Sequence, residues 1–134
     1  MKIRFDFNSP VVLVFSLLAV LVYIVNELTA QQLMPMFSLS GHFNFSSPVQ
    51  YITLLTYVIG HGNLQHLMGN LMLVLLLGPV LEEKYGSSKL LLMITATALV
   101  TAFFHILFFS TRVLGASGIV FMFIILVSFV NVRR

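Results

Sequence analysis

The sequence predicts an all-α integral membrane protein, and three observations support this class. Of its 134 residues, 59% are hydrophobic and only 8% are charged, which leaves too little polar surface to cover a water-soluble domain of this size. Thirteen Phe and seven Met residues, with many Leu and Val, exclude a disordered or collagen-like chain. Several stretches without a charged residue reach the length of about 20 residues that a membrane-spanning helix needs.

The first span is predicted at residues 9–28. Lys2 and Arg4 precede this apolar run, an arrangement that is also typical of a cleaved signal peptide. The run is long for a signal peptide, and Leu28-Thr29-Ala30 is a poor cleavage site, so we expect a permanent anchor.

An outer loop follows the first span and continues to residue 62. It mixes large apolar side chains with polar ones, which suits a segment lying in the outer membrane interface. A linker covered by the rest of the protein would have the same composition, so both interpretations stay open. The loop ends at the turn-rich segment Gly60-His61-Gly62-Asn63, after which an apolar helix can begin.

Three further spans are predicted at residues 63–81, 90–110 and 115–132, which makes residues 1–134 a single domain with four spans. Lys and Arg collect on the cytoplasmic side of membrane proteins, so their positions indicate the orientation. Six of the seven fall at the two ends of the chain or between the second and third spans: Lys2, Arg4, Lys84, Lys89, Arg133 and Arg134. We therefore expect both ends in the cytoplasm and only Arg112 on the other side. No nucleic-acid partner is expected from so few charges.

Polar side chains within the spans are candidates for function, because each costs free energy in hydrocarbon unless it has a partner. His66 and Asn70 are four residues apart, so they project from one face of the second span near its outer end. Ser117 lies between small residues at the outer start of the fourth span, and His105 is predicted at a similar depth. A serine at a helix start, where free N–H groups favour an oxyanion, has the surroundings of a nucleophile. Small residues are also common where membrane helices pack, so this spacing alone leaves both interpretations open.

Four linked motifs support a resemblance that covers about residues 49–134. They are Leu54-Leu55-Thr56 with His61, then His61-Gly62-Asn63-Leu64-Gln65-His66-Leu67-Met68-Gly69-Asn70, then the segment 78–87, then Gly115-Ala116-Ser117-Gly118. Their order, intervals and predicted side of the membrane resemble the rhomboid family of intramembrane serine proteases.

The resemblance implies a rhomboid-like bundle in which Ser117 is the nucleophile. His66 and Asn70 would line the oxyanion hole together with the Ser117 backbone N–H. The structural residues near the site would be Gly115, Gly118, His61 and Glu82, with Glu82 in a hydrogen-bonded network towards the cytoplasmic side. The resemblance implies no cofactor and no metal. The expected partners are the lipid bilayer and transmembrane protein substrates.

Two departures from the family pattern affect these expectations. Many bacterial relatives carry a Trp-Arg pair in the outer loop, where this chain has Ile52 and Thr53. The family's general base is a histidine on a sixth span, and no histidine follows His105 in this sequence. We therefore expect a chain truncated after the fourth of six helices. A natural short form, or His105 as a substitute base, are the alternatives.

The leading functional hypothesis is hydrolysis of peptide bonds in or near substrate transmembrane segments, at a site open to the extracytoplasmic side of a bacterial cytoplasmic membrane. The alternative is a catalytically incomplete rhomboid-like protein that binds transmembrane helices without cleaving them, because the expected base histidine is absent. A third hypothesis is haem binding with His66 and His105 as axial ligands. This hypothesis would give Asn70 and Ser117 no functional role.

Overall fold

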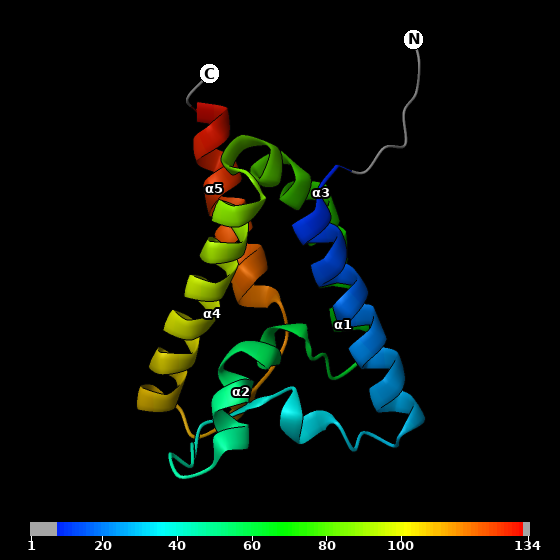
Figure 1. Cartoon of the computed structure of the whole chain (residues 1–134), viewed down its shortest axis with the longest axis vertical. Coiled ribbons are helices and arrows are strands. Elements are labelled where there is room, and N and C mark those ends of the chain that lie inside the picture. Colours follow the sequence, from blue (N-terminus) through cyan, green and yellow to red (C-terminus); the bar gives the residue numbers. More distant parts are fainter. Residues whose placement is uncertain (1–7, 133–134) are drawn as a thin grey trace.

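The computed structural model describes residues 8–132, and four long helices dominate this part of the chain (Figure 1). These are α1 (Pro10–Leu28), α3 (Leu64–Tyr85), α4 (Ser87–Phe108) and α5 (Ser117–Val132). The connecting segments contain η1 (Met34–Met36), β1 (Leu39–Ser40), α2 (Pro48–Thr56), η2 (Tyr57–Ile59) and β2 (Arg112–Val113). The predicted all-α class is confirmed, and the only strands in the described residues form one short two-stranded pair.

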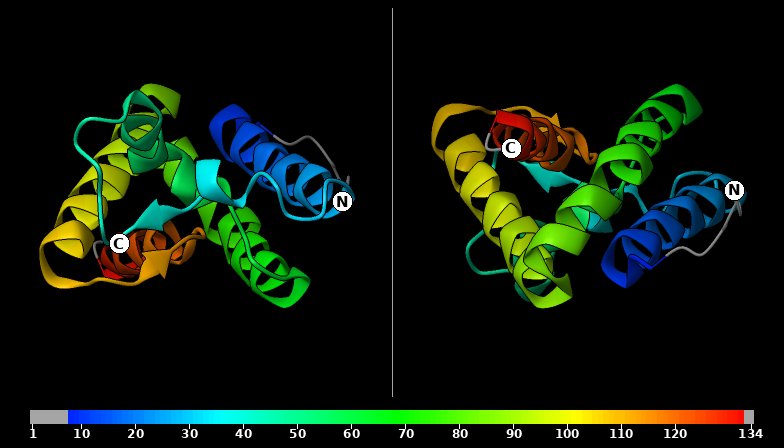
Figure 2. Two further views of the ribbon diagram at one scale, coloured as in Figure 1. Left: turned by 90° about the horizontal axis from the view of Figure 1, so that it is seen from below. Right: turned by 90° about the horizontal axis from the view of Figure 1, so that it is seen from above.

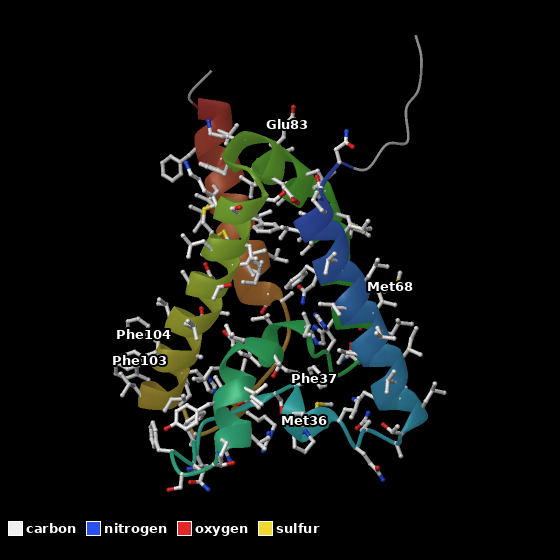
Figure 3. All side chains as sticks on the ribbon, in the orientation of Figure 1. Met36, Phe37, Met68, Glu83, Phe103 and Phe104 are labelled. Carbon is white, nitrogen blue, oxygen red and sulfur yellow. The ribbon has the colours of Figure 1, made fainter. Side chains whose placement is uncertain are left out.

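Three of the predicted spans are long and apolar enough to cross a membrane: α1 with 19 residues, and α3 and α4 with 22 each. Helix α5 is also apolar but has 16 residues, below the usual range of about 17–25 for a crossing helix. Large apolar side chains cover the outward faces. Phe103 and Phe104 on α4 point away from the other helices (Figure 3) and are 61% and 53% exposed, as expected of groups that face lipid.

The helix ends differ from the predicted spans at the turn between α3 and α4. Helix α3 continues to Tyr85 although the apolar run stops at Leu81, and α4 begins at Ser87. Charged residues end the apolar stretch but do not end a helix. The break comes at Gly86, whose φ of 87° lies in the left-handed region that glycine enters without a Cβ penalty.

Helix α3 passes between α1 on one side and α4 and α5 on the other (Figure 2), and it packs against all three. Gly78 allows a close approach, because a Cβ there would lie 2.6 Å from Val12 Cγ2 and 3.3 Å from Phe123 Cε2. Val12 and Phe123 are almost fully buried, so neither can move aside easily. One part of the buried core therefore forms where α1, α3 and α5 meet, and α4 contributes Leu90, Ile94, Ala98 and Ala102 to the same core.

One turn along α3 from Gly78, the carboxylate of Glu82 connects α3 to the starts of α1 and α4. It accepts hydrogen bonds from the backbone N–H groups of Val11 (2.9 Å) and Val12 (3.0 Å) and from the Ser87 hydroxyl (2.6 Å). The side chain of Ser9, the N-cap of α1, makes no capping hydrogen bond, so Glu82 of α3 satisfies donors that the first turn of α1 leaves open. A negative charge at a helix N-terminus is also favoured by the helix dipole.

The outer loop lies between the ends of α1 and α4, which diverge in that direction (Figure 1). Tyr57 anchors it, because its hydroxyl donates to the Ala98 carbonyl at 2.9 Å. Strand β1 pairs antiparallel with β2, with Leu39 opposite Val113, so this loop is also tied to the segment before α5. Helix α2 and the strand pair were not predicted. The interfacial position of the loop stays a prediction.

The predicted orientation in the membrane, with both chain ends in the cytoplasm, stays a prediction, although the arrangement of the described elements agrees with it. The start of α1, the α3–α4 turn and the end of α5 lie at one end of the bundle (Figure 1). Lys84 and Lys89 are at this end, and Arg112 belongs to β2 at the other.

Substituting Glu82→Gln is expected to lower the free energy of unfolding by about 2 kcal/mol, the range for hydrogen bonds to a charged acceptor. The new amide keeps one acceptor oxygen but turns an NH₂ group towards an N–H or hydroxyl. Reversible unfolding in detergent, followed by far-UV circular dichroism, measures the change. The control is Glu83→Gln, because Glu83 is exposed and points away from the bundle (Figure 3), and it should stay within about 0.5 kcal/mol of the parent. Equal effects of the two variants would contradict the capping role.

Candidate active site

Ser117 is the first residue of α5 and is exposed. The first backbone hydrogen bond of this helix runs from Val120 N to Ala116 O (2.9 Å). The N–H groups of Ser117, Gly118 and Ile119 therefore donate to no carbonyl within the helix. Such N–H groups, at the positive end of the helix dipole, favour a negatively charged oxygen. The serine thus has both a solvent-accessible hydroxyl and nearby donors for an oxyanion.

The backbone that leads into Ser117 is held by His61. The Nε2 atom of this imidazole lies 3.3 Å from Ala116 N and 3.1 Å from Asn70 Nδ2. Both partners are donors, so Nε2 must be the acceptor, and a neutral ring then carries its proton on Nδ1. His61 is only 2% exposed. Two hydrogen bonds therefore connect Asn70 of α3, through His61, to the residue before Ser117.

Gly115 makes this arrangement possible. Its φ is 115°, a conformation that residues with a Cβ rarely adopt. A Cβ there would lie 3.7 Å from the His61 ring and 3.8 Å from Asn70 Nδ2, and the Gly115 N–H donates to the Tyr57 carbonyl at 2.8 Å. The chain therefore turns into α5 directly against His61 and Asn70.

The Ser117 hydroxyl lies at a groove between α4 and α5, a cavity of about 440 Å³. The lining residues are Thr97, Thr101, Ser117, Gly118, Phe121, Met122, Ile125 and Leu126. Gly118 faces α4, since a Cβ there would lie 3.8 Å from Thr101 Oγ1. Thr97 and Thr101 were not among the predicted site residues. Their spacing of one helical turn in an apolar span is the signal that could have found them.

Tyr57 lies at a second, smaller cavity of about 40 Å³ that Ser117 also lines. Burial raises the pKa of Tyr57 from 10.0 to about 12, so its hydroxyl remains a hydrogen-bond donor at neutral pH.

The two predicted oxyanion residues lie on the α3 side of this region. Asn70 is partly buried beside Gly115 and His61. His66 is exposed, and its backbone N–H donates to Asn63 Oδ1 (2.9 Å), the N-cap of α3. The spacing of four residues puts His66 one turn from Asn70 on the same helix face. Neither residue lines the two cavities at Ser117. Their role as oxyanion donors stays a prediction.

No imidazole among residues 8–132 is hydrogen-bonded to Ser117 Oγ. His61 Nε2 already accepts from two donors. His105 Nε2 lies 2.6 Å from the Thr111 carbonyl, to which it must donate, and its ring stacks on Phe109 at 5.4 Å. His105 thus stabilises the end of α4 and the loop to β2, and it lines neither of the two cavities at Ser117. Within the same residues, no cluster of three or more His, Asp or Glu side chains could hold a metal ion.

Glu82 was predicted in a hydrogen-bonded network and was grouped with the structural residues near the site; the network is present, but it lies far from Ser117. Glu82 lies 16 residues along α3 from His66, about 24 Å at 1.5 Å per residue, at the other end of the bundle. Its partners, two backbone amides and Ser87, belong to the start of α1 and α4. Glu82 therefore stabilises the fold and has no contact with the region around Ser117.

Comparison with known families gives one match. The family model described as the Rhomboid domain matches residues 48–134, from the start of α2 to the end of the chain. This region contains every residue described around Ser117. No curated protein matches the chain.

Lowering the pH is expected to destabilise the protein through His61, which lies between η2 and α3. Burial lowers the pKa of His61 below its ordinary value of 6.5. Well above pH 6.5 the imidazole is neutral in both the folded and the unfolded states. Below it the unfolded chain takes up the proton first, so the free energy of unfolding falls, by up to about 1.4 kcal/mol for each pKa unit of difference. Protonated Nε2 would also face two donors.

Unfolding of the parent and of His61→Gln at about pH 7.5 and about pH 5.5 tests this linkage. The glutamine can accept a hydrogen bond but does not titrate, so the variant should lose less stability on acidification than the parent. An identical loss in both proteins would show that His61 is not the responsible group.

Proposed function

The chain belongs to the rhomboid family of multi-pass membrane proteins, and on that premise we propose that it is an intramembrane serine protease with Ser117 as its nucleophile. The observation that supports this most directly is the position of Ser117. This exposed residue lies at the start of α5, at one end of a largely apolar groove. The N–H groups beside it make no hydrogen bond to a carbonyl of the helix. The substrates are transmembrane segments of other proteins.

The reaction is acyl transfer. Ser117 Oγ attacks the carbonyl carbon of the scissile peptide bond while a histidine accepts the hydroxyl proton. The oxyanion that forms receives hydrogen bonds from the Ser117 N–H and from His66 and Asn70. The tetrahedral intermediate collapses as the C–N bond breaks, and the amine leaves with the proton. Water then hydrolyses the ester and frees the serine. Among residues 8–132, no histidine is hydrogen-bonded to Ser117 as the proton acceptor that this reaction needs.

The groove below Ser117 suits an unwound apolar segment. Carbonyl groups in an intact helix are already hydrogen-bonded, so the scissile region must lose its helical structure before the serine can attack. Phe121, Met122 and Ile125 offer apolar contacts, while the Thr97 and Thr101 hydroxyls can donate to carbonyls that unwinding exposes. The proposed orientation, with both ends of a single four-span domain in the cytoplasm, opens this site to the extracytoplasmic side, where water is available for hydrolysis.

A second candidate is a member of the family that binds transmembrane helices without cleaving them. One observation favours it: in residues 8–132, no imidazole is hydrogen-bonded to Ser117, and the Nε2 atoms of His61 and His105 are both engaged elsewhere. A binding protein would use the same groove but would not need a reactive hydroxyl. The two candidates therefore differ in the reactivity of Ser117.

The full-length protein in native membranes should react with a fluorophosphonate probe and cleave a reporter that carries one transmembrane segment. Ser117→Ala should abolish labelling and reduce cleavage by at least about 10³-fold, because the nucleophile is lost. The control is Ser128→Ala. Ser128 is an exposed serine of the same helix whose hydroxyl donates to the Ile124 carbonyl, and its loss should change neither readout. Reporter binding without labelling or cleavage in the parent would favour the non-catalytic candidate.

His66→Ala is expected to lower kcat by about 10²–10³-fold, the usual effect of removing one oxyanion donor. The side chain is exposed, so the free energy of unfolding should change by less than about 0.5 kcal/mol. Gln65→Ala, an exposed neighbour on the same turn, is the matched control and should keep full activity. A loss of stability without a loss of kcat would mean that His66 has only a structural role.

A further inference from the structure

A polar cavity of about 210 Å³ lies at the loop end of the bundle, away from the Ser117 groove. It is several times larger than the ~30 Å³ that one water molecule occupies in the liquid. Its lining residues come from the outer loop, α2 and β2: Pro35, Ser38, Ser40, Ser47, Val49, Gln50, Thr53 and Arg112. Six of these eight side chains are polar. Neither the fold nor the proposed proteolysis gives this cavity a role.

Arg112 supplies the positive charge of the cavity and is held in place there. One guanidinium nitrogen donates to Ser38 Oγ at 2.8 Å, and Ser38 Oγ donates in turn to the Met34 carbonyl at 2.6 Å. Ser38 is only 1% exposed, and Ser40 pairs with Arg112 in the β1–β2 register. This bond uses one N–H of the guanidinium, which leaves further donors of its planar fork for a ligand.

Gln50 and Ser47 add further donors to the cavity. Gln50 Oε1 accepts from the Asn44 N–H at 2.7 Å, which leaves the amide NH₂ of Gln50 to donate. The Ser47 hydroxyl makes no capping bond although Ser47 is the N-cap of α2, so it too can donate into the cavity. The start of α2 adds the positive end of a helix dipole.

No acidic side chain in the contributing segments balances this charge. The sequence has no Asp or Glu between Leu28 and Leu81, and none after Glu83. Arg112 therefore has no carboxylate partner from the loop, from α2 or from β2. A concave site with a guanidinium, several donors and no acid is suited to a tetrahedral anion.

The surroundings indicate where the anion comes from. Val49 lines the cavity and is 49% exposed, and Phe45 and Ile52, within two residues of the lining residues Ser47 and Thr53, are 67% and 52% exposed, although all three are apolar. Apolar groups beside a polar anion site match a phospholipid, whose phosphate and acyl chains belong to one molecule. We propose that this cavity binds the phosphate of a phospholipid headgroup and so anchors the outer loop to the membrane surface.

Binding is measured on the full chain, purified and lipid-depleted in a neutral maltoside detergent, by titration with dihexanoyl phosphatidylglycerol and, separately, with inorganic phosphate. The lipid should bind at least about tenfold more tightly than inorganic phosphate, because only the lipid also contacts the apolar rim. Equal binding of the two would overturn the lipid as the ligand in favour of free phosphate.

Two variants test the site itself. Gln50→Glu is nearly isosteric and keeps the acceptor for the Asn44 N–H, but it puts a negative charge in the cavity; it should weaken lipid binding at least about tenfold. Gln32→Glu makes the same charge change at an exposed position of the same loop, outside the cavity, and should bind like the parent. Arg112→Gln should reproduce the loss. Circular dichroism checks that each variant is folded. Unchanged binding in Gln50→Glu, or equal weakening in Gln32→Glu, would overturn the proposal.

Discussion

The buried carboxylate of Glu82 is the interaction on which the arrangement of the helices depends. It bonds to two backbone amides at the start of α1 and to Ser87 at the start of α4, while it belongs to α3. In lipid the hydrophobic effect does not drive helices together, so in a chain with few polar groups it does not determine which helices pack against each other. A buried acceptor with three donors from other elements favours one particular packing of these helices. It sets how α1 enters the bundle, and Gly78 then allows α1 and α3 to approach closely.

A second polar connection operates at the opposite end of α3. Asn70 and His61 hold the backbone at Ala116, and Gly115 adopts the conformation that turns the chain into α5. The hydrogen bonds end one residue before Ser117, so the serine is positioned through its backbone while its hydroxyl stays accessible. This separation of positioning from reactivity is what a nucleophile requires, because a hydroxyl engaged in structural bonds would be less available to attack.

Particular residues show how far sequence reasoning reaches. The apolar runs predicted the long helices, and linked motifs predicted the family that the domain match shows. The pattern did not predict α2, because its nine residues mix apolar and polar types in a way that also suits a loop. The motifs indicated a hydrogen-bonded network for Glu82 but grouped this residue with the site, since a motif records order along the chain and not distance in space.

What the sequence alone determined is the class of protein and the residue types available for chemistry. Apolar length decides whether a segment can cross a bilayer, and this is a local property of the chain. Only the tertiary structure decided which polar groups meet. His61 reaches Ala116 across 55 positions, and Arg112 reaches Ser38 across 74. Such contacts depend on how helices rotate and cross, which follows from the packing of the whole bundle and leaves no local pattern in the sequence.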